Sequence, residues 1–239
     1  MNRIALITGA SRGLGATLAR FLAGLDYDLV LTARRPVPLS DLAGSLMPTS
    51  GRVVTRAGDV ADPGHRQRLV ETAASLGGLD LLVNCASTLG PTPLPPLVEL
   101  PPIALEDIFG VNVLAPLGLV QAALPLLGKR GGLVVNVSSD AAVGGYPGWG
   151  GYGASKAALD LISLTLANEL GDRGIAVVSV DPGDMRTDMH QAAYPGEDIS
   201  DRPTPEATLP FFAWLLGQEP SRISGRRYAA QDETWELAA

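Results

Sequence analysis

The sequence predicts an α/β fold in which a doubly wound parallel sheet of about seven strands carries helices on both faces. Short runs rich in β-branched residues and leucine alternate with longer stretches that have apolar residues at helical spacing, which is typical of βαβ units. Most of the short runs are apolar throughout, as expected of strands covered on both sides. No repeat, charge run or Ser-rich linker divides the 239 residues, so we predict a single domain over 1–239.

The order of the elements follows from the same pattern. We expect strands at 3–8, 28–32, 52–57, 79–83, 133–138, 175–180 and 227–230, and helices at 14–25, 63–76, 105–127, 152–170 and 205–216. Residues 89–102 hold too many prolines for a helix or a central strand, and residues 183–202 show no clear period. Because ligands of open α/β sheets bind beyond the carboxyl ends of the strands, we expect both segments to shape a pocket, the second as a substrate lid around 183–204.

The composition is that of a compact globular protein, with 46% hydrophobic and 18% charged residues. The formal net charge of −7 argues against binding to nucleic acid or to an anionic membrane surface. A single cysteine, Cys85, cannot form an intramolecular disulfide, and the apolar run at the N-terminus is too short for a signal peptide or a membrane span. These observations favour a cytoplasmic protein.

A glycine-rich turn follows the first predicted strand, where residues 8–15 read TGASRGLG and a helical pattern begins. Gly9 suits a tight turn, Gly13 lets the backbone approach a pyrophosphate, and Gly15 allows close packing of helix on strand. The free amides at the helix N-terminus attract the same anion. Glycine triplets serve many folds, but the strand before this one and the helix after it favour a Rossmann-like dinucleotide site.

The end of the second predicted strand indicates which dinucleotide binds. NAD-binding proteins usually carry an acidic residue there, which hydrogen-bonds the ribose 2′-hydroxyl. Residues 32–35 read TARR instead, and the guanidinium groups of Arg34 and Arg35 suit a 2′-phosphate, with Arg12 adding to the same positive pocket. We therefore expect NADP(H) as the cofactor. The alternative is that Arg34 and Arg35 are only solvated turn residues.

Tyr152 and Lys156 lie four residues apart at the start of a predicted helix, so their side chains share one face. A phenol has a pKa near ~10, and a nearby ammonium favours its ionised form, so Lys156 would make Tyr152 a usable acid or base. Ser139 ends a predicted strand, where its hydroxyl can bind a substrate carbonyl oxygen. Taken singly, Tyr152 and Lys156 could be an ordinary surface pair, and Ser139 could be a capping residue. Together with the glycine turn, the three residues predict a catalytic site.

In this order the motifs resemble those of the short-chain dehydrogenase/reductase family, in its shorter single-domain type, over nearly the whole chain. Residues 8–15, which include Ser11 and Leu14, match the cofactor turn of the family. Asp59 and Val60 match its adenine-contacting pair. The resemblance therefore implies that these residues bind the cofactor.

Further motifs of the same family cover the second half of the chain. Asn112 in FGVNV matches the family's helix asparagine, and Ser139 with YGASK at 152–156 matches its catalytic core. Residues 181–187 (DPGDMRT) resemble the family element that contacts the nicotinamide half of the cofactor, through Pro182, Gly183 and Thr187.

The resemblance implies that NADPH gives a hydride to a carbonyl carbon while Tyr152 protonates the oxygen, and that the reverse reaction uses the same groups. Ser139 would steady that oxygen, Lys156 would also hold the nicotinamide ribose, and Asn112 would help to keep a water that links Lys156 to solvent. The substrate would be a small carbonyl compound or alcohol. The family usually forms dimers or tetramers through the helices expected at 105–127 and 152–170, so we expect a homodimer or homotetramer.

Two other functions fit the same fold. A regulatory or scaffold protein would bind NADP without turnover, but the retention of all four family residues, Asn112, Ser139, Tyr152 and Lys156, argues against it. An isomerase or dehydratase would keep its nucleotide bound. Relatives of that kind usually have a longer chain and another glycine pattern, which disfavours this alternative.

One departure from the family pattern follows the fourth predicted strand, where Asn84-Cys85-Ala86-Ser87 stands in place of the usual Asn-Asn-Ala-Gly. Asn84 and Ala86, which the resemblance assigns to the cofactor, are retained. Cys85 cannot replace the hydrogen bonds of asparagine, which predicts a local loss of stability, and a buried inert thiol is favoured over a redox-sensitive one. Ser87 requires either a negative φ or modest strain near the cofactor.

The remaining polar candidates have simpler interpretations. His65 and His190 are far apart and have no companion cysteines, so we expect surface histidines and no metal site. Asp140 either tunes Ser139 or forms a turn or cap, and the second is favoured. Three aromatic residues either line an apolar pocket or pack in the ordinary way: Tyr146, Trp149 and Tyr194.

Overall fold

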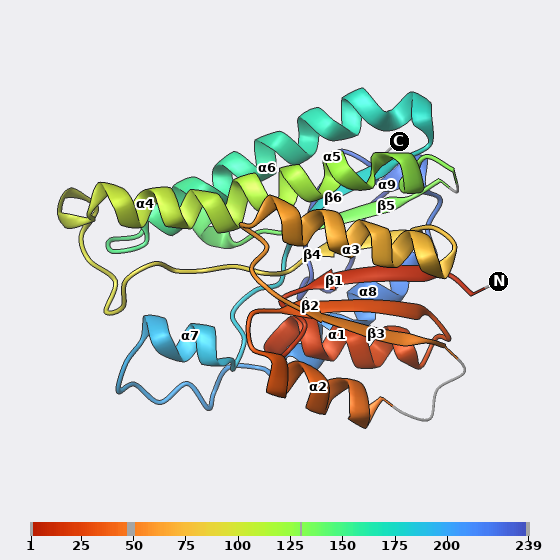
Figure 1. The fold of residues 1–239 in the computed structure, drawn as a ribbon. Helices are drawn as coiled ribbons and strands as arrows, with labels where there is room; N and C mark the ends of the chain where they lie inside the picture. Colours follow the sequence, from red (N-terminus) through yellow and green to blue (C-terminus); the bar gives the residue numbers. More distant parts are fainter. Residues whose placement is uncertain (1, 47–50, 130, 238–239) are drawn as a thin grey trace.

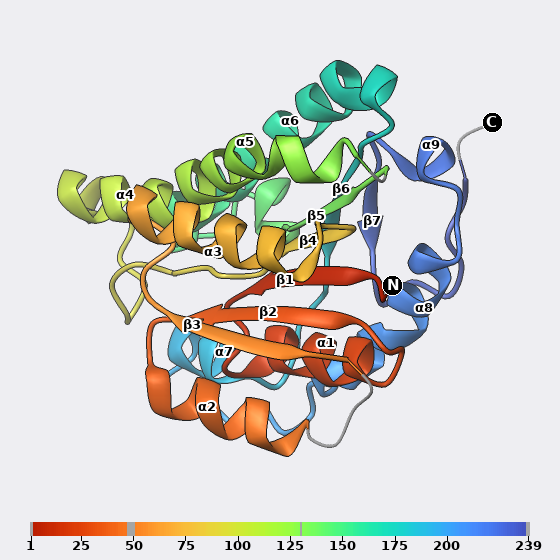
Figure 2. The same cartoon turned by 45° about the vertical axis from the view of Figure 1, so that its right-hand side comes forward.

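The computed structural model describes residues 2–46, 51–129 and 131–237 of the chain. Seven parallel strands form one sheet in the order β3-β2-β1-β4-β5-β6-β7 (Figures 1 and 2). The strands are β1 (Ile4–Thr8), β2 (Asp28–Ala33), β3 (Val53–Ala57), β4 (Leu81–Asn84), β5 (Leu133–Val137), β6 (Ala176–Asp181) and β7 (Arg227–Ala229). The predicted doubly wound, Rossmann-like sheet is confirmed, while the domain range of 1–239 extends beyond the described residues.

Helices cover both faces of this sheet. The longer ones are α1 (Gly13–Ala23), α2 (Pro36–Ser45), α3 (Pro63–Leu76), α4 (Pro102–Phe109), α5 (Ala115–Leu127), α6 (Gly150–Leu170) and α8 (Leu209–Leu216), and the shorter ones are α7 (Asp188–Ala193) and α9 (Pro220–Ile223). A π-helical turn, η2 (Gly110–Leu114), joins α4 to α5, and 3-10 turns occur at η1 (Leu97–Glu99), η3 (Asp140–Ala142), η4 (Gly171–Arg173) and η5 (Pro205–Thr208). Figure 1 shows α3, α4, α5 and α6 on one side of the sheet, and α1 and α2 on the other.

Side chains of the strands alternate between two hydrophobic clusters, one under each helical layer. In β1, Ala5 and Ile7 belong to the cluster that packs against α1, α2 and α8, whereas Ile4 and Leu6 belong to the cluster beneath α3, α5 and α6. Because helices exclude water from both faces, both sets of alternating positions have to be apolar. The central strands therefore form a rigid platform whose carboxyl ends can hold a site.

Several helical features differ from the prediction, including the short helices α7 and α9, which it lacks. Helix α2 lies where no helix is expected, because its sequence begins with two prolines, Pro36 and Pro38, and buries only Leu39 and Leu42. Proline is tolerated in the first helical turn, where its missing N–H would have no partner. The helix expected at 105–127 begins three residues earlier, at Pro102, and the π turn η2 interrupts it.

The carboxyl ends of the strands meet at one edge of the sheet, and the strand order reverses there between β1 and β4. Figure 1 shows α7, the proline-rich loop after β4 and the start of α4 gathered beyond this edge. The proline-rich loop is irregular apart from η1, as expected, whereas the predicted lid contains a regular element, α7. This edge is where the candidate site is built.

The stretch Pro102–Leu127 is long and apolar enough to cross a membrane by length and composition, and it is the one such helical stretch found among the described residues, with a mean hydropathy of 1.7. In the fold this stretch packs against α3 and α6. Core helices of globular proteins pass the same test, so the helical layer accounts for its apolar composition.

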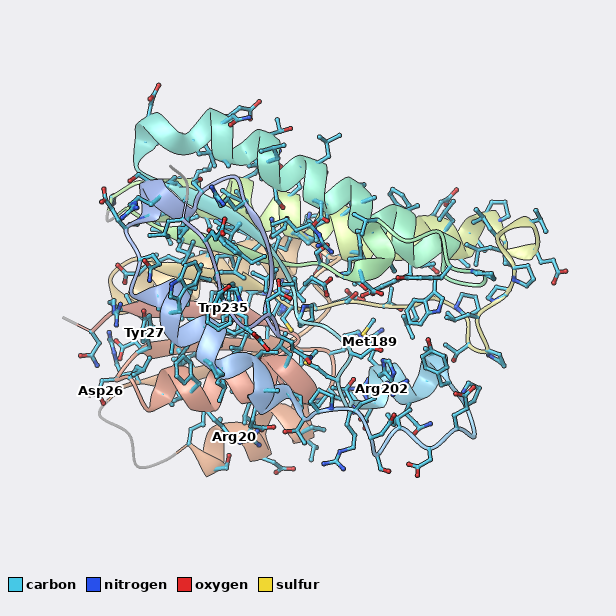
Figure 3. All side chains as sticks on the ribbon, turned by 180° about the vertical axis from the view of Figure 1, so that it is seen from behind. Arg20, Asp26, Tyr27, Met189, Arg202 and Trp235 are labelled. Atoms are coloured by element: carbon cyan, nitrogen blue, oxygen red, sulfur yellow. The ribbon has the colours of Figure 1, made fainter. Side chains whose placement is uncertain are left out.

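The last described residues pack against α8, on the face of the sheet that α1 and α2 cover. The indole ring of Trp235 lies 5.3 Å from the ring of Phe211 and 5.6 Å from that of Trp214, between centroids, and Figure 3 shows Trp235 beside α8. Its Nε1 donates a hydrogen bond of 2.9 Å to the carbonyl of Ala229. These contacts fix the last described residues onto α8 and β7.

Candidate active site

A cleft of about 990 Å³ opens at the carboxyl edge of the sheet. Most residues predicted at the site line it: Gly9, Ser11, Arg12, Gly13, Leu14, Gly15, Arg34, Arg35, Asp59, Val60, Ala86, Ser139, Tyr152, Lys156, Pro182, Gly183 and Thr187. Two predicted residues, Asn84 and Asn112, do not belong to the cleft wall. The cleft runs from the end of β2, across β1, to α6 and the lid.

The glycine turn after β1 brings backbone close to backbone. Gly9 has a φ of +68°, and a Cβ atom there would lie 2.9 Å from the backbone of Ala86. A Cβ atom on Gly15 would lie 2.4 Å from the carbonyl oxygen of Gly9. Helix α1 has no side-chain cap at Arg12, so its N-terminus can attract an anion in the cleft. Only glycine fits this cradle, as the sequence predicts.

The β2 end of the cleft carries positive charge. Arg34 and Arg35 are exposed on its wall, and no carboxylate among the described residues pairs with either. Arg12 differs from expectation, because its guanidinium donates to the carboxylate of Asp188 in α7 over 2.7 Å. Asp59 accepts a hydrogen bond of 2.8 Å from the amide of Ala61, which orders the loop that follows β3.

Tyr152 and Lys156 lie side by side in the first turns of α6, with the Lys156 ammonium 5.5 Å from the centre of the phenol ring. Both side chains are buried. The ammonium donates a hydrogen bond of 2.7 Å to the carbonyl of Val137, at the end of β5. Burial lowers the pKa of Lys156 from 10.5 to about 8, against the opposing effect of Cys85 and Asp160.

The pKa of Tyr152 moves in the direction opposite to the prediction. Burial is the largest influence and raises it above the usual value for a phenol, while hydrogen bonds with Ser139 and Ser87 act to lower it. The carboxylates of Asp181 and Asp140 raise it further. The expected net lowering by Lys156 is therefore wrong for this structure, in which loss of hydration outweighs the hydrogen bonds that lower this pKa and the Lys156 ammonium is not among its main influences.

Ser139 follows β5 and begins the 3-10 turn η3. Its hydroxyl accepts a hydrogen bond of 3.2 Å from the amide of Ala141 and donates one of 3.0 Å to the carboxylate of Asp140. Asp140 fits both of its predicted roles, because it is the first residue of the turn η3 and its carboxylate also orients the Ser139 hydroxyl. The hydroxyl is placed where a substrate oxygen beside Tyr152 can reach it.

Asn112 lies within the π turn η2, and its side chain is fully buried. Its amide nitrogen donates to the Thr88 carbonyl (2.9 Å) and to the Ser155 hydroxyl (3.0 Å), while its oxygen accepts from the Thr88 amide (2.9 Å) and the Ser87 hydroxyl (3.1 Å). All four hydrogen-bonding positions of the amide are occupied. A water near Lys156 therefore has no free position on this side chain, which instead joins η2, the loop after β4 and α6.

The departure at 84–87 has clear structural consequences. Asp26 is the one non-glycine residue with a positive φ among those described, so Ser87 adopts a negative φ and carries no backbone strain. Loss of hydration raises the pKa of the Cys85 thiol to about 11, against the opposing charge of Lys156. A thiol that stays protonated is a weak nucleophile, which supports the inert interpretation of Cys85.

Asn84 corrects a further expectation. Its amide nitrogen donates a hydrogen bond of 2.8 Å to the Asn136 side chain in β5, and Asn136 in turn donates to the Ser163 hydroxyl in α6 over 2.7 Å. The side chain therefore points into the layer between the sheet and α6 rather than to the cofactor cleft. Asn84 supports the site by fixing β4, β5 and α6 relative to one another.

The prediction of surface histidines is wrong. His65 is 1% exposed, and its Nε2 lies 2.8 Å from the Thr32 hydroxyl. A Cβ atom on Gly58 would lie 2.4 Å from the ring, so this glycine makes room for it. The His190 side chain is 10% exposed and its Nδ1 lies 3.7 Å from Asp184. The described residues contain no group of three or more His, Cys, Asp or Glu side chains placed to hold a metal ion.

Two residues support the site through contacts that the sequence analysis does not predict. The Thr8 hydroxyl accepts hydrogen bonds of 3.0 Å from the amides of both Cys85 and Ala86, which joins the loops after β1 and β4. Arg227 in β7 donates to the Ser139 carbonyl (2.8 Å) and to the Asp181 carboxylate (3.0 Å). A positive residue in a short last strand could have suggested such a partner for Asp181.

The lid and the aromatic residues form the far wall of the cleft. The ring of Trp149 lies 5.6 Å from that of Tyr152 and 6.0 Å from that of Tyr194, between centroids. Met189 from α7 belongs to the same wall, and Figure 3 shows its side chain beside this helix. The pocket interpretation of Trp149, Tyr146 and Tyr194 is therefore supported, since all three line the cleft.

Comparison with known proteins decides the family. The family model for short chain dehydrogenases matches residues 3–198. The chain belongs to the short-chain dehydrogenase/reductase family. The resemblance seen in the motifs is confirmed, and an oxidoreductase of this family is the function class that follows.

Two relatives match over most of their length. An uncharacterised oxidoreductase, YciK, of Escherichia coli is 32% identical over 235 residues, which span 96% of this chain and 92% of the relative. Dehydrogenase/reductase SDR family member 4 of Bos taurus is 31% identical, with 94% of this chain and 84% of the relative covered.

Two solved structures of similar proteins contain a nucleotide. A short chain dehydrogenase from Shigella flexneri in complex with NADP is 32% identical, with a TM-score of 0.89 over 97% of this chain and 98% of that one. Another from Escherichia coli, in complex with NADPH, is 32% identical, with a TM-score of 0.87 and the same coverage of 97% and 98%.

Proposed function

We propose that this oxidoreductase interconverts a ketone or aldehyde and the corresponding alcohol with NADP(H), and that Tyr152 exchanges the proton at the reacting oxygen. The observation that carries the proposal is the placement of Tyr152, Lys156 and Ser139 at one end of a cleft whose other end carries Arg34 and Arg35, which have no carboxylate partner among the described residues. A phenol, an ammonium and a hydroxyl around one space suit a reaction in which an oxygen gains or loses a proton.

The residues present fit an NADP(H) cofactor. The glycine cradle leaves room for a pyrophosphate against the uncapped N-terminus of α1, and Arg34 and Arg35 offer guanidinium groups to a 2′-phosphate. The two similar structures with bound NADP and NADPH support the same choice. Bound there, the cofactor would supply or accept the hydride at the substrate carbon.

The chain's own groups account for the rest of the chemistry. The protonated phenol of Tyr152 can donate its proton to a carbonyl oxygen as that oxygen becomes an alcohol. The Ser139 hydroxyl, once turned from Asp140, can donate a hydrogen bond to the same oxygen. The Lys156 ammonium stabilises the phenolate that remains, because the two groups lie within the same turn of α6.

The experiment that tests this proposal measures nucleotide binding and turnover separately. Purified protein is titrated with NADPH and NADH by cofactor fluorescence, and NADPH oxidation is then followed against ketones, aldehydes, quinones and ketoacyl thioesters. We expect tight binding of NADPH and turnover of at least one carbonyl class. Binding without turnover on the whole panel would favour the regulatory alternative instead.

Tyr152→Phe then tests the role of the phenol, and Tyr228→Phe is its matched control. Tyr228 is buried among aromatic side chains, and its hydroxyl has no hydrogen-bond partner among the described residues. Tyr152→Phe should keep NADPH binding and lose most turnover, whereas Tyr228→Phe should keep both. Full activity in Tyr152→Phe would refute the assigned proton transfer.

A further inference from the structure

A third hydrophobic cluster lies outside the two clusters of the core. Its buried members are Leu89 from the loop after β4, Ala141 from η3 and Tyr152 from α6. Trp149 and Met189 are among the partly buried side chains that pack against them. Leu89, Tyr152, Trp149 and Met189 also line the cleft. The phenol of Tyr152 therefore belongs to an apolar part of the cleft wall.

Aromatic rings extend this apolar wall from the start of α6 to the lid. The ring of Trp149 lies 5.6 Å from that of Tyr152, between centroids, in an edge-to-face arrangement with an interplanar angle of 67°. It also lies 6.0 Å from the ring of Tyr194, which follows α7. Aromatic rings attract one another in such arrangements beyond the effect of buried area alone. A ring that enters the cleft beside Tyr152 would meet the same surface.

Carboxylates also line this end of the cleft, from Asp140, Asp181 and Asp184. Asp181 pairs with Arg227 over 3.0 Å, and Asp184 pairs with an arginine of the lid, Arg202, over 3.6 Å. Neither arginine belongs to the cleft wall. Asp140 has no cationic partner among the residues that the structure describes. The carboxylates therefore face a ligand in the cleft, whereas the arginines that balance two of them do not.

The cations of the cleft do not offset these carboxylates for a ligand beside Tyr152. The arginines of the cleft wall come from the glycine turn and the end of β2, at the opposite end. The Lys156 ammonium is buried and donates its hydrogen bond to the end of β5. His190 lies 3.7 Å from Asp184 in the lid. A negatively charged group on a substrate would therefore be repelled here, and a neutral one would not.

We propose that the substrate of this site is a neutral ketone or aldehyde with a flat aromatic group on its carbonyl carbon, and that Trp149 and Tyr194 select it. The carbonyl oxygen would lie beside Tyr152 and Ser139, with the aromatic group against the Trp149 ring. This inference rests on the proposed function and deepens it, since it names the class of carbonyl compound that the cleft accepts.

The reaction itself is unchanged by this choice of substrate. The carbonyl carbon gains a hydride from NADPH, its oxygen gains the Tyr152 proton, and the C=O double bond becomes a single bond. The products are NADP⁺ and an aryl-substituted alcohol, and the phenolate regains a proton from solvent. The aromatic group does not react, so its contacts affect which substrate is used and not how the proton moves.

The test uses three aldehydes with NADPH at neutral pH: methyl para-formylbenzoate, para-formylbenzoate and propanal. The first two have the same ring and differ mainly in one negative charge. With wild-type protein, kcat/KM for the ester should exceed that for the carboxylate by about tenfold or more, as expected of like charges within a partly dry cleft. It should also exceed the value for propanal, which has no ring to lie against Trp149.

Two variants test the aromatic wall independently. Trp149→Leu and Tyr194→Leu each remove a ring and keep an apolar side chain. The Trp149 side chain makes no capping hydrogen bond to α6, so its replacement removes no cap. Each variant should lower the ratio of kcat/KM for the ester to kcat/KM for propanal by about threefold to tenfold, because a lost ring contact affects only the aromatic substrate. Because the two residues come from different segments, one variant serves if the other does not fold.

Trp235→Leu is the matched control, because its indole packs beside α8 and away from the cleft (Figure 3). It should leave the ratio as in wild type. Equal kcat/KM for the ester and the carboxylate, a higher value for propanal, or an unchanged ratio in either folded ring variant would overturn the inference and leave the proposed function intact. A wild-type protein that turns over no carbonyl compound with NADPH would overturn the proposed function and this inference with it.

Discussion

Replacement of Lys156 by methionine should separate stability from activity. Lys156 is 2% exposed, and its ammonium donates a hydrogen bond to the Val137 carbonyl. Methionine has a similar length and no charge, so Lys156→Met keeps the packing approximately and removes the buried ammonium. The variant should lose turnover, because no cation would remain beside the Tyr152 phenolate.

The effect on stability follows from the lowered pKa of Lys156. A fall from 10.5 to about 8 means that burial of the ammonium destabilises the fold by about 3 kcal/mol at neutral pH. Loss of the hydrogen bond to the Val137 carbonyl lowers the free energy of unfolding of the variant by about 1 to 3 kcal/mol, but that effect does not depend on pH. The pH dependence therefore isolates the contribution of the charge.

The direction of this pH dependence is fixed. Between pH 8 and 10.5, the unfolded chain binds a proton at Lys156 that the folded chain does not. Wild-type stability therefore rises with pH in this window, and the destabilisation by the ammonium is fully present below about pH 8. The free energy of unfolding of Lys156→Met minus that of wild type should therefore fall by about 1.4 kcal/mol between about pH 7 and pH 9.

Urea unfolding of both proteins at several pH values measures this difference in the free energy of unfolding. Lys129→Met removes the exposed lysine, the other lysine of the sequence, and controls for the change in net charge. A free-energy difference between wild type and Lys156→Met that stays constant from pH 7 to pH 9 would refute the reasoning.

Two further predictions concern the cofactor and the assembly. Arg34→Asp should lower the NADPH to NADH ratio of kcat/KM by about tenfold to a hundredfold, because a guanidinium that would bind the 2′-phosphate is replaced by a carboxylate that repels it. Steady-state kinetics with both cofactors measures this ratio. An unchanged ratio would count against the 2′-phosphate site. The outer face of α6 exposes Leu161 (66%) and Leu164 (45%), so we propose that it forms a contact between subunits. Light scattering should then find a dimer or tetramer, and a smaller species after substitution of both leucines by glutamate; a wild-type monomer would reject this assembly.

The sheet could be predicted from the sequence because burial on both faces imposes a simple pattern. Each of the seven predicted strands lies within two residues of an observed one, since runs such as β1 are apolar at every position but the last and every position of β1 and β6 is buried. Helix α2 could not be predicted, because its two prolines and two buried leucines give a weak helical period. Local pattern therefore identifies elements with many buried side chains and misses those with few.

The site was predictable where a residue acts through its own position in a motif. The glycine turn, Ser139, Tyr152 and Lys156 all line the cleft for this reason. The buried hydrogen bonds of Asn84 and His65 were not predictable, because the partner residues, Asn136 and Thr32, are distant in sequence. The same holds for the pKa of Tyr152, which depends on burial by segments distant in sequence.

The central claim is that the cleft carries out hydride transfer to a carbonyl carbon with Tyr152 as the proton donor. The most direct measurement uses NADPH with deuterium at the reacting position of the nicotinamide, together with the best carbonyl substrate, and locates the deuterium in the product by mass spectrometry and NMR. We expect deuterium on the carbinol carbon with wild-type protein and almost no labelled alcohol with Tyr152→Phe. Alcohol formed without the label, or labelled equally fast by Tyr152→Phe, would contradict the account.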